Sequence, residues 1–105
     1  MTVLPRRGEI WWAEAEDGRR PVLVVTRSEA VPILDAILVA PVTSRIRGIQ
    51  TEIVLGRRHG VRVDCCASFD NMFRIRTRML SERVGHLQPD DMHEICRALE
   101  AMADC

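Results

Sequence analysis

Two apolar runs decide the fold of this chain: Arg19-Arg20-Pro21-Val22-Leu23-Val24-Val25 and, after a short excursion, Ile37-Leu38-Val39-Ala40-Pro41-Val42-Thr43-Ser44. Both are rich in β-branched residues, which predicts two buried strands. If the strands pair antiparallel, the start of the first meets the end of the second. Arg20 would then share one end of a sheet with the hydroxyl groups of Thr43 and Ser44. A guanidinium beside two hydroxyl groups is suited to holding a phosphate group without a metal ion.

The flanking sequence predicts further strands on both sides of this pair. A strand over 9–13 leads through polar residues to Asp17-Gly18, a dipeptide typical of a hairpin turn. The central pair itself is expected to cover 20–26 and 36–42. Downstream strands are expected over 52–55, 61–69 and 83–87, while 70–78 fits either a strand or an extended loop.

The C-terminal segment predicts a single helix that begins at Pro89. Proline is favoured at the first helical position, and Asp90 and Asp91 follow where acidic side chains interact favourably with the helix dipole. Apolar residues then recur every three or four positions and form one stripe: Met92, Ile95, Cys96, Leu99, Met102 and Ala103. Five or six strands followed by one helix predict a mainly β fold, a small antiparallel barrel or open sheet closed by the helix.

Composition limits the class of protein. The chain has 105 residues, 47% of them hydrophobic, which is enough for one modest core and predicts a single domain over 1–105. No apolar run approaches the roughly 20 residues that a membrane-spanning helix needs, and 1–7 lacks the apolar region of a signal peptide. We therefore expect a cytoplasmic protein with no membrane partner.

Charge is distributed unevenly, although the net charge is zero. Residues 43–83 hold nine arginines against four acidic residues, whereas 84–105 hold one arginine against five acidic residues. This asymmetry favours a polyanionic partner on one side of the molecule. Every basic residue is arginine, which binds phosphate with two parallel N–H donors. Codon bias accounts for the absence of lysine, but not for the clustering of arginines in the middle.

The four cysteines, Cys65, Cys66, Cys96 and Cys105, do not predict a metal site. No pair has CxxC spacing, and Cys65 and Cys66 would point to opposite faces of a strand. We expect free thiols, and neither a metal ion nor another cofactor.

Several segments, taken in order along the chain, resemble the MazF/PemK/Kid family of toxin–antitoxin endoribonucleases. They are Arg7-Gly8-Glu9-Ile10-Trp11, 20–25, 40–44, 51–55, and 80–87 leading into the helix. The resemblance covers nearly the whole chain. It implies an SH3-like antiparallel β-barrel of the CcdB/PemK type, a homodimer, cleavage of single-stranded RNA, and neutralisation by a cognate antitoxin.

The resemblance also implies roles for individual residues. Arg20 matches the catalytic arginine of the family, and Thr43 matches its catalytic threonine. Asn71 is a relative of the usual glutamine, but Phe73 replaces an arginine and Arg76 replaces an acidic residue, which is expected to alter the bases recognised. The residues expected to contact RNA are Arg19, Ser44, Arg45, Arg47, Asp70, Asn71, Arg74 and Arg76.

RNA can be cut without water as the first nucleophile, because a 2′-hydroxyl group lies beside every phosphate. Its oxygen attacks phosphorus, and a cyclic phosphate and a 5′-hydroxyl group form. Arg20 and Thr43 would stabilise the charge that gathers on the phosphoryl oxygens. Arginine does not deprotonate near neutral pH, so the general base must be another group. Three candidates stay open: Glu16, Asp17 and His59.

The residues outside this motif predict how partners approach. Trp11 and Trp12 are adjacent, so one faces the core and the other faces outward. The outward one either stacks on an RNA base or packs against a second subunit, and the subunit contact is slightly favoured. The acidic residues of the C-terminal helix predict that RNA approaches the opposite side, along the subunit boundary. An acidic, extended antitoxin segment is expected to compete for the arginine-rich surface.

Two alternatives compete with a nuclease. CcdB toxins share the fold class and bind DNA gyrase, but their tails end in a tryptophan-containing tripeptide, whereas this chain ends Met102-Ala103-Asp104-Cys105. The other alternative is a plain SH3-like interaction module or a catalytically weak relative that only binds antitoxin, which the departures at Phe73 and Arg76 keep open.

Overall fold

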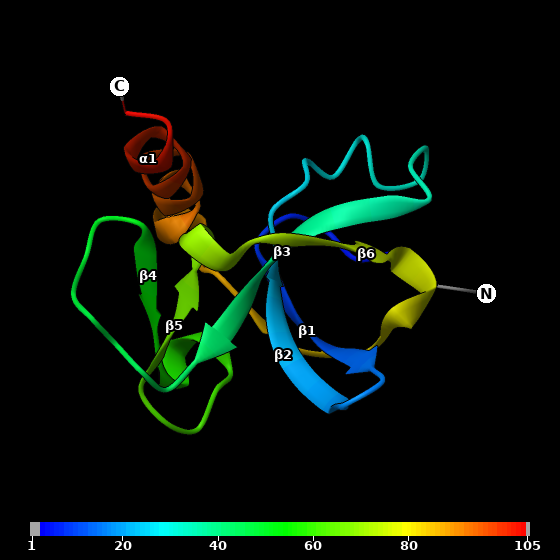
Figure 1. Cartoon of the computed structure of the whole chain (residues 1–105), viewed down its shortest axis with the longest axis horizontal. Helices are drawn as coiled ribbons and strands as arrows, with labels where there is room; N and C mark the ends of the chain where they lie inside the picture. Colours follow the sequence, from blue (N-terminus) through cyan, green and yellow to red (C-terminus); the bar gives the residue numbers. More distant parts are fainter. Residues whose placement is uncertain (1–2, 105) are drawn as a thin grey trace.

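The computed structural model describes residues 3–104, which form seven strands, short 3-10 turns and one α-helix. The strands are β1 (Glu9–Ala15), β2 (Gly18–Val24), β3 (Ala36–Thr43), β4 (Glu52–Leu55), β5 (Cys65–Ser68), β6 (Phe73–Arg76) and β7 (Leu80–His86). They pair in the order β4-β5-β3-β2-β1-β7, and β6 pairs with β3 outside this order. The sheet curls into a partly open barrel with the helix α1 (His93–Met102) beside β4 (Figure 1). The expected fold class, mainly antiparallel β with a C-terminal helix, is confirmed.

The predicted hairpin is present at the start of the sheet. Ala15 of β1 pairs with Gly18 of β2, so two residues form the turn. Gly18 has φ +123°, which glycine adopts without strain. β2 then pairs with β3 as predicted, with Val22 opposite Pro41.

The strand predicted over 61–69 is shorter than expected. β5 begins only at Cys65, because the chain before it runs over the surface and leaves Val63 66% exposed. An apolar residue in the sequence does not by itself bring the backbone into a sheet.

Two other expectations in this half of the chain are corrected or settled. The last strand begins at Leu80 rather than at 83, because Leu80 pairs with Ala13 and two register shifts keep β7 alongside β1. The segment 70–78, for which strand and loop were both open, contains β6 between two 3-10 turns.

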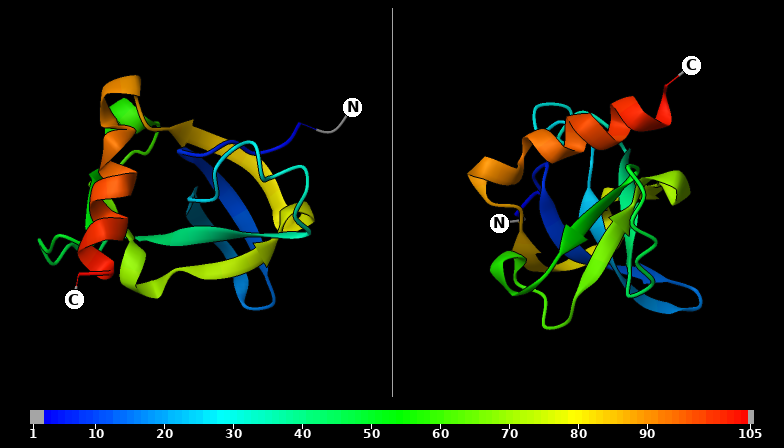
Figure 2. Two further views of the ribbon diagram at one scale, coloured as in Figure 1. Left: turned by 90° about the horizontal axis from the view of Figure 1, so that it is seen from above. Right: turned by 90° about the vertical axis from the view of Figure 1, so that its left-hand side faces the viewer.

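The helix begins later than predicted. Residues 89–91 form a 3-10 turn, and α1 starts at His93. Ile95 and Ala98 are fully buried against the core. Three residues that were expected in the apolar stripe are exposed: Cys96, Met102 and Ala103. Figure 2 shows α1 along one side of the sheet, away from the β1–β2 hairpin. Within the part of the chain that the structure describes, no helix is long and apolar enough to cross a membrane.

The core consists of two clusters on the two faces of the central strands. Leu23 and Phe69 pack with the helix in one cluster, and Val22 and Trp11 pack in the other. Trp11 is buried and Trp12 is half-buried on the other face, so the prediction that one faces inward is confirmed. Cys65 and Cys66 are buried free thiols, while Cys105 lies outside the described residues.

A hydrogen-bonded latch joins the 57–60 turn to the start of the helix. Nδ1 of His59 accepts from Gly56 N–H (3.1 Å), and Nε2 of His59 donates to Asp91 (3.1 Å). Asp91 also accepts from the backbone N–H of Gln88 (3.1 Å) and pairs with Arg58 (3.1 Å). Burial opposes ionisation of Asp91, but the hydrogen bonds from Gln88 and His59 and the charge of Arg58 lower its pKa below the ordinary 3.8.

We expect Asp91→Asn to lower the free energy of unfolding at pH 6 by about 1–3 kcal/mol, because it weakens three contacts at once. A carboxyl group whose pKa is lower in the folded than in the unfolded state stabilises the folded protein. Its contribution is fully present above the pKa of the unfolded state and is lost as the pH falls through the pKa of the folded state. The difference in melting temperature between wild type and variant should therefore become smaller as the pH is lowered from 6 to 3. Asp90→Asn is the control, since Asp90 makes an exposed pair with Arg58 worth at most about 1 kcal/mol. If both variants lose the same free energy of unfolding, the latch does not contribute the stability expected of it.

Candidate active site

The register of β2 and β3 brings Arg20 and Thr43 together. The β2–β3 pairing ends at Val22 opposite Pro41, and Arg20 and Thr43 each lie two residues beyond this last pair, at the same end of the two strands. Residues two apart on a strand share a face, so both side chains point to the same side of the sheet. These four residues line one hollow of about 520 Å³, called here the Arg20 hollow. Its other polar or aromatic lining residues are Asp17, Arg45, Arg47, Ser68, Asn71 and Phe73.

The Arg20 guanidinium is available to a ligand. Its side chain is 62% exposed and is ion-paired with Asp17, three residues earlier in the hairpin turn. An exposed pair of this kind is worth at most about 1 kcal/mol, so a phosphate group can replace it at little cost. Asp17 therefore orients the guanidinium without sequestering it.

The Thr43 hydroxyl group is held in a donating arrangement. Its Oγ1 accepts a hydrogen bond from the backbone N–H of Arg45 (3.2 Å). The hydroxyl proton remains to be donated to another oxygen in the hollow. Arg20 and Thr43 can thus contact the same anionic group from two strands.

A buried carboxyl group shapes the β3–β4 loop, which carries Arg45 and Arg47 to the hollow. Oε1 of Glu52 accepts from the backbone N–H groups of Arg47 and Gly48, both at 3.0 Å, and the residue is 4% exposed. Burial, and then the neighbouring Glu52, raise the pKa of the Cys66 thiol to about 11. Sequence reasoning missed Glu52, although an acidic residue at the start of an apolar strand was a usable signal.

Several residues expected to contact RNA lie outside the Arg20 hollow. Arg19 faces the other side of β2, where it pairs with Glu14 and Glu82 and its guanidinium lies 4.8 Å from the centre of the Trp12 ring. Ser44 likewise lines a different groove.

The remaining residues of that prediction are also elsewhere. Asp70 accepts a hydrogen bond from Thr51 Oγ1 and does not line the hollow. Arg74 and Arg76 pair in register with Leu38 and Ala36, on the face of β6 opposite to Phe73. The structure therefore brings together Arg20, Thr43, Arg45, Arg47 and Asn71 from the predicted set.

The three candidate general bases are separated by the fold. His59 is buried, both its ring nitrogens are engaged in the latch, and it does not line the Arg20 hollow. Glu16 does not line the Arg20 hollow, whereas Asp17 does.

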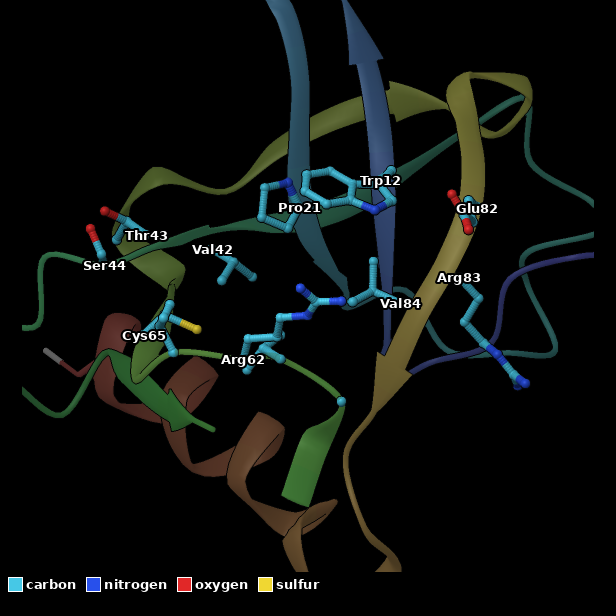
Figure 3. Close-up of a pocket in the computed structure, with 13 residues that line it drawn as sticks. Trp12, Pro21, Val42, Thr43, Ser44, Arg62, Cys65, Glu82, Arg83 and Val84 are labelled. Atoms are coloured by element: carbon cyan, nitrogen blue, oxygen red, sulfur yellow. The ribbon is translucent and has the colours of Figure 1, made fainter. Parts of the chain in front are cut away.

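A second groove of about 640 Å³ lies on the other side of Thr43. Figure 3 shows its apolar wall of Trp12, Pro21 and Val84, with the Arg62 guanidinium pointing into it. The hydroxyl groups of Thr43 and Ser44 stand at one end (Figure 3). Thr43 therefore lines both depressions.

Comparison with known proteins identifies relatives of this chain. Residues 6–103 match the family model described as PemK-like, MazF-like toxin of type II toxin-antitoxin system. The "Probable endoribonuclease MazF5" of Mycobacterium tuberculosis (strain ATCC 25618 / H37Rv) is 44% identical over 113 residues, covering 100% of this chain and 98% of that protein.

Solved structures agree with the sequence matches. The Mycobacterium tuberculosis toxin MazF-mt6 is 30% identical and has a TM-score of 0.84, covering 91% of this chain and 96% of that one. An endoribonuclease from a mycobacterial species, solved with its cognate antitoxin, shares the fold with a TM-score of 0.82 at 21% identity, covering 94% of each chain. The chain belongs to the family of PemK-like, MazF-like toxins of type II toxin–antitoxin systems.

Proposed function

We propose that this chain, an endoribonuclease toxin of the MazF type, cuts single-stranded mRNA at specific sequences without a metal ion. The 2′-hydroxyl group attacks the neighbouring phosphate, which gives a 2′,3′-cyclic phosphate and a 5′-hydroxyl group. The observation that carries the proposal is that Arg20 and Thr43 face one hollow from neighbouring strands.

The two side chains have complementary roles in this reaction. Arg20 binds the phosphoryl oxygens through parallel N–H donors and offsets the charge that grows on them. Thr43 donates its hydroxyl proton to the same group. Arg45 and Arg47 bind the phosphates that flank the cut. Because Arg74 faces another side of β6, it contacts only RNA that extends around this strand.

Asp17 is the general base in this proposal, because it lines the hollow and contacts Arg20. Its carboxylate takes the proton of the 2′-hydroxyl group as the new bond to phosphorus forms. The bond from phosphorus to the 5′-oxygen breaks, and that oxygen takes a proton from solvent.

The test is incubation of the purified protein with mixed-sequence single-stranded RNA in EDTA. We expect cleavage to persist, the new 5′ ends to accept a kinase label without phosphatase treatment, and the new 3′ ends to be blocked until acid opens the cyclic phosphate. Cleavage that EDTA abolishes overturns metal independence. Intact RNA alongside inhibited gyrase supports the CcdB-like alternative, and intact RNA alongside tight antitoxin binding supports the catalytically weak relative.

The homodimer is proposed to form through the groove of Figure 3. Trp12 is half-buried there beside Pro21 and Val84, an apolar surface of the kind that subunit contacts cover. Two copies meeting at this groove would place their Arg20 hollows along the subunit boundary.

We expect Trp12→Glu to convert a dimer into a monomer in sedimentation velocity, because a charge replaces the largest apolar side chain of the groove. Thermal melting should show that the variant stays folded, since Trp12 lies outside both core clusters. A variant that sediments as the wild-type dimer contradicts this interface.

The second partner is a cognate antitoxin that acts with this toxin in the cytoplasm. The related fold solved with its antitoxin supports a partner of this kind. An acidic, extended segment would compete with RNA for Arg20, Arg45 and Arg47. Simultaneous binding of antitoxin and RNA at full affinity contradicts this competition.

A further inference from the structure

We propose that Phe73, with Asn71 beside it, forms a nucleobase-binding subsite next to the phosphate-binding pair Arg20 and Thr43. The base of a nucleotide adjoining the cut stacks on the Phe73 ring. The inference rests on the proposed function and goes beyond it, because it assigns a ligand to a part of the hollow that no step of the cleavage uses.

The Phe73 ring is exposed, although aromatic and apolar side chains near it in the sequence pack into the core. It is 39% exposed, while Phe69, four residues earlier, is fully buried in the core. On β6 the neighbouring residue of the same face, Ile75, packs against the core, so the strand is anchored beside the exposed ring.

Strand pairing anchors the backbone at Phe73 and sets the face of β6 on which the ring lies. Phe73 pairs in register with Val39 of β3, whose side chain is fully buried. The strand ladder and this buried partner fix the position from which the ring faces the hollow. A rigid aromatic surface is the form of platform on which a base stacks with little entropy cost.

The rest of the hollow explains what would cover this ring. It is lined by Arg20, Arg45 and Arg47, which attract an anion, and by Phe73, which offers a flat apolar surface. A nucleotide presents both a phosphate and a flat aromatic base, so it complements both features. A purely acidic ligand would leave the ring exposed, and a purely apolar ligand would make no contact that uses the charge of the guanidinium groups.

Asn71 can read an edge of the stacked base. Its Nδ2 donates to Ser68 Oγ (2.9 Å), which fixes the amide plane. Asn71 lines the hollow, and within residues 3–104 the structure assigns no hydrogen bond to its Oδ1, which leaves this acceptor available to a ligand. The amide thus adds hydrogen-bond recognition to the stacking on Phe73.

The test uses 2′-O-methyl RNA 12-mers, which lack a free 2′-hydroxyl group and so are not cut by the proposed route. Each carries the fluorescent base 2-aminopurine at one position. We expect quenching at one position on binding the wild-type protein. Phe73→Leu should abolish this quenching and weaken binding by about five- to 150-fold, the effect of losing one base–aromatic stack. Phe73→Trp should restore both.

Leu38→Ala is the matched control. Leu38 is 38% exposed and lies on β3, but its register partner is Arg74, on the face opposite to Phe73. This variant should bind the 12-mers as the wild type does, and circular dichroism melts should confirm that all variants are folded.

The outcomes separate this inference from the proposed function. Suppose that the wild-type protein cuts RNA and that Phe73→Leu quenches and binds the 12-mers as the wild type does. This result overturns the subsite but not the proposed function. So does weakened binding that Phe73→Trp fails to restore, because that result indicates packing rather than stacking. A third outcome is that Phe73→Leu loses affinity for an acidic peptide but keeps its affinity for the 12-mers. The ring would then bind a protein partner, and the nucleobase subsite would again be overturned. Wild-type protein that neither cuts nor binds RNA overturns the proposed function itself.

Discussion

Replacing Arg20 with alanine is expected to lower kcat/KM for RNA cleavage by about a hundredfold to a thousandfold, the usual effect of removing one donor that stabilises an oxyanion. The guanidinium is 62% exposed and contributes only a weak ion pair, so the fold should be unchanged. Arg20→Lys should recover only part of the loss, because an ammonium group lacks the paired donors that match two phosphoryl oxygens. Single-turnover cleavage of one RNA, with thermal melting in parallel, measures both effects.

Arg27→Ala is the control for this prediction. It removes the same charge from an arginine that lines a different depression, formed with Ile33 and Leu34. A small effect on cleavage in this variant assigns the loss at Arg20 to its position rather than to net charge. Equal losses at both positions would mean that arginine acts only through the overall field, and the catalytic assignment would fail.

The placement of Arg20 and Thr43 beside one hollow was predictable because it needs only two buried strands and one antiparallel pairing. Both strands were evident from their apolar runs, and Val22 opposite Pro41 gives the pairing that joins the two ends. The fold class followed from the same reasoning. The family resemblance added the expectation that the chain is an endoribonuclease.

The apolar pattern of the strands could not predict which of two adjacent residues lies on the face of the sheet that carries the hollow. Arg19 and Arg20 alternate on β2, but which one faces the hollow depends on the exact register with β3. Arg19 instead lies against Trp12 on the other face. Alternation is a local property of a strand, whereas register depends on contacts between segments far apart in the sequence.

The short strands β5 and β6 were less predictable for a related reason. Each has four residues, and β6 exists because Phe73 to Arg76 pair with the long strand β3. Val63 is as apolar as its buried neighbours, yet it is exposed because the chain there has no partner strand in the described structure. Tertiary pairing rather than local preference decides such segments.

Replacing Glu52 with alanine is expected to lower kcat/KM for RNA cleavage by about ten- to hundredfold, although Glu52 touches no substrate. Its Oε1 holds the backbone N–H groups of Arg47 and Gly48, and without it the β3–β4 loop loses its internal anchor. Arg47 would then leave the hollow, and a misplacement of about 1 Å is enough for losses of this size. Glu52→Gln keeps the accepting oxygen and should recover most of the activity.

A salt titration of RNA binding distinguishes this positioning effect from a general loss of stability. Each phosphate contact on a single strand contributes about 0.7 to the slope of log affinity against log salt, so Glu52→Ala should lower the slope by about that amount. Ile95→Val is the matched control, because it destabilises the buried face of the helix by about 0.5–1.5 kcal/mol without touching the loop.

The double variant of Glu52→Ala with Arg47→Gln completes the argument. If Glu52 acts through Arg47, the double variant should have the same slope of log affinity against log salt as Arg47→Gln alone. The reason is that Glu52→Ala has no further effect once the Arg47 side chain is absent. Additive losses would show that Glu52 supports the fold in general. A buried carboxyl group would then be a stabilising feature of β4 rather than the group that keeps Arg47 at the site.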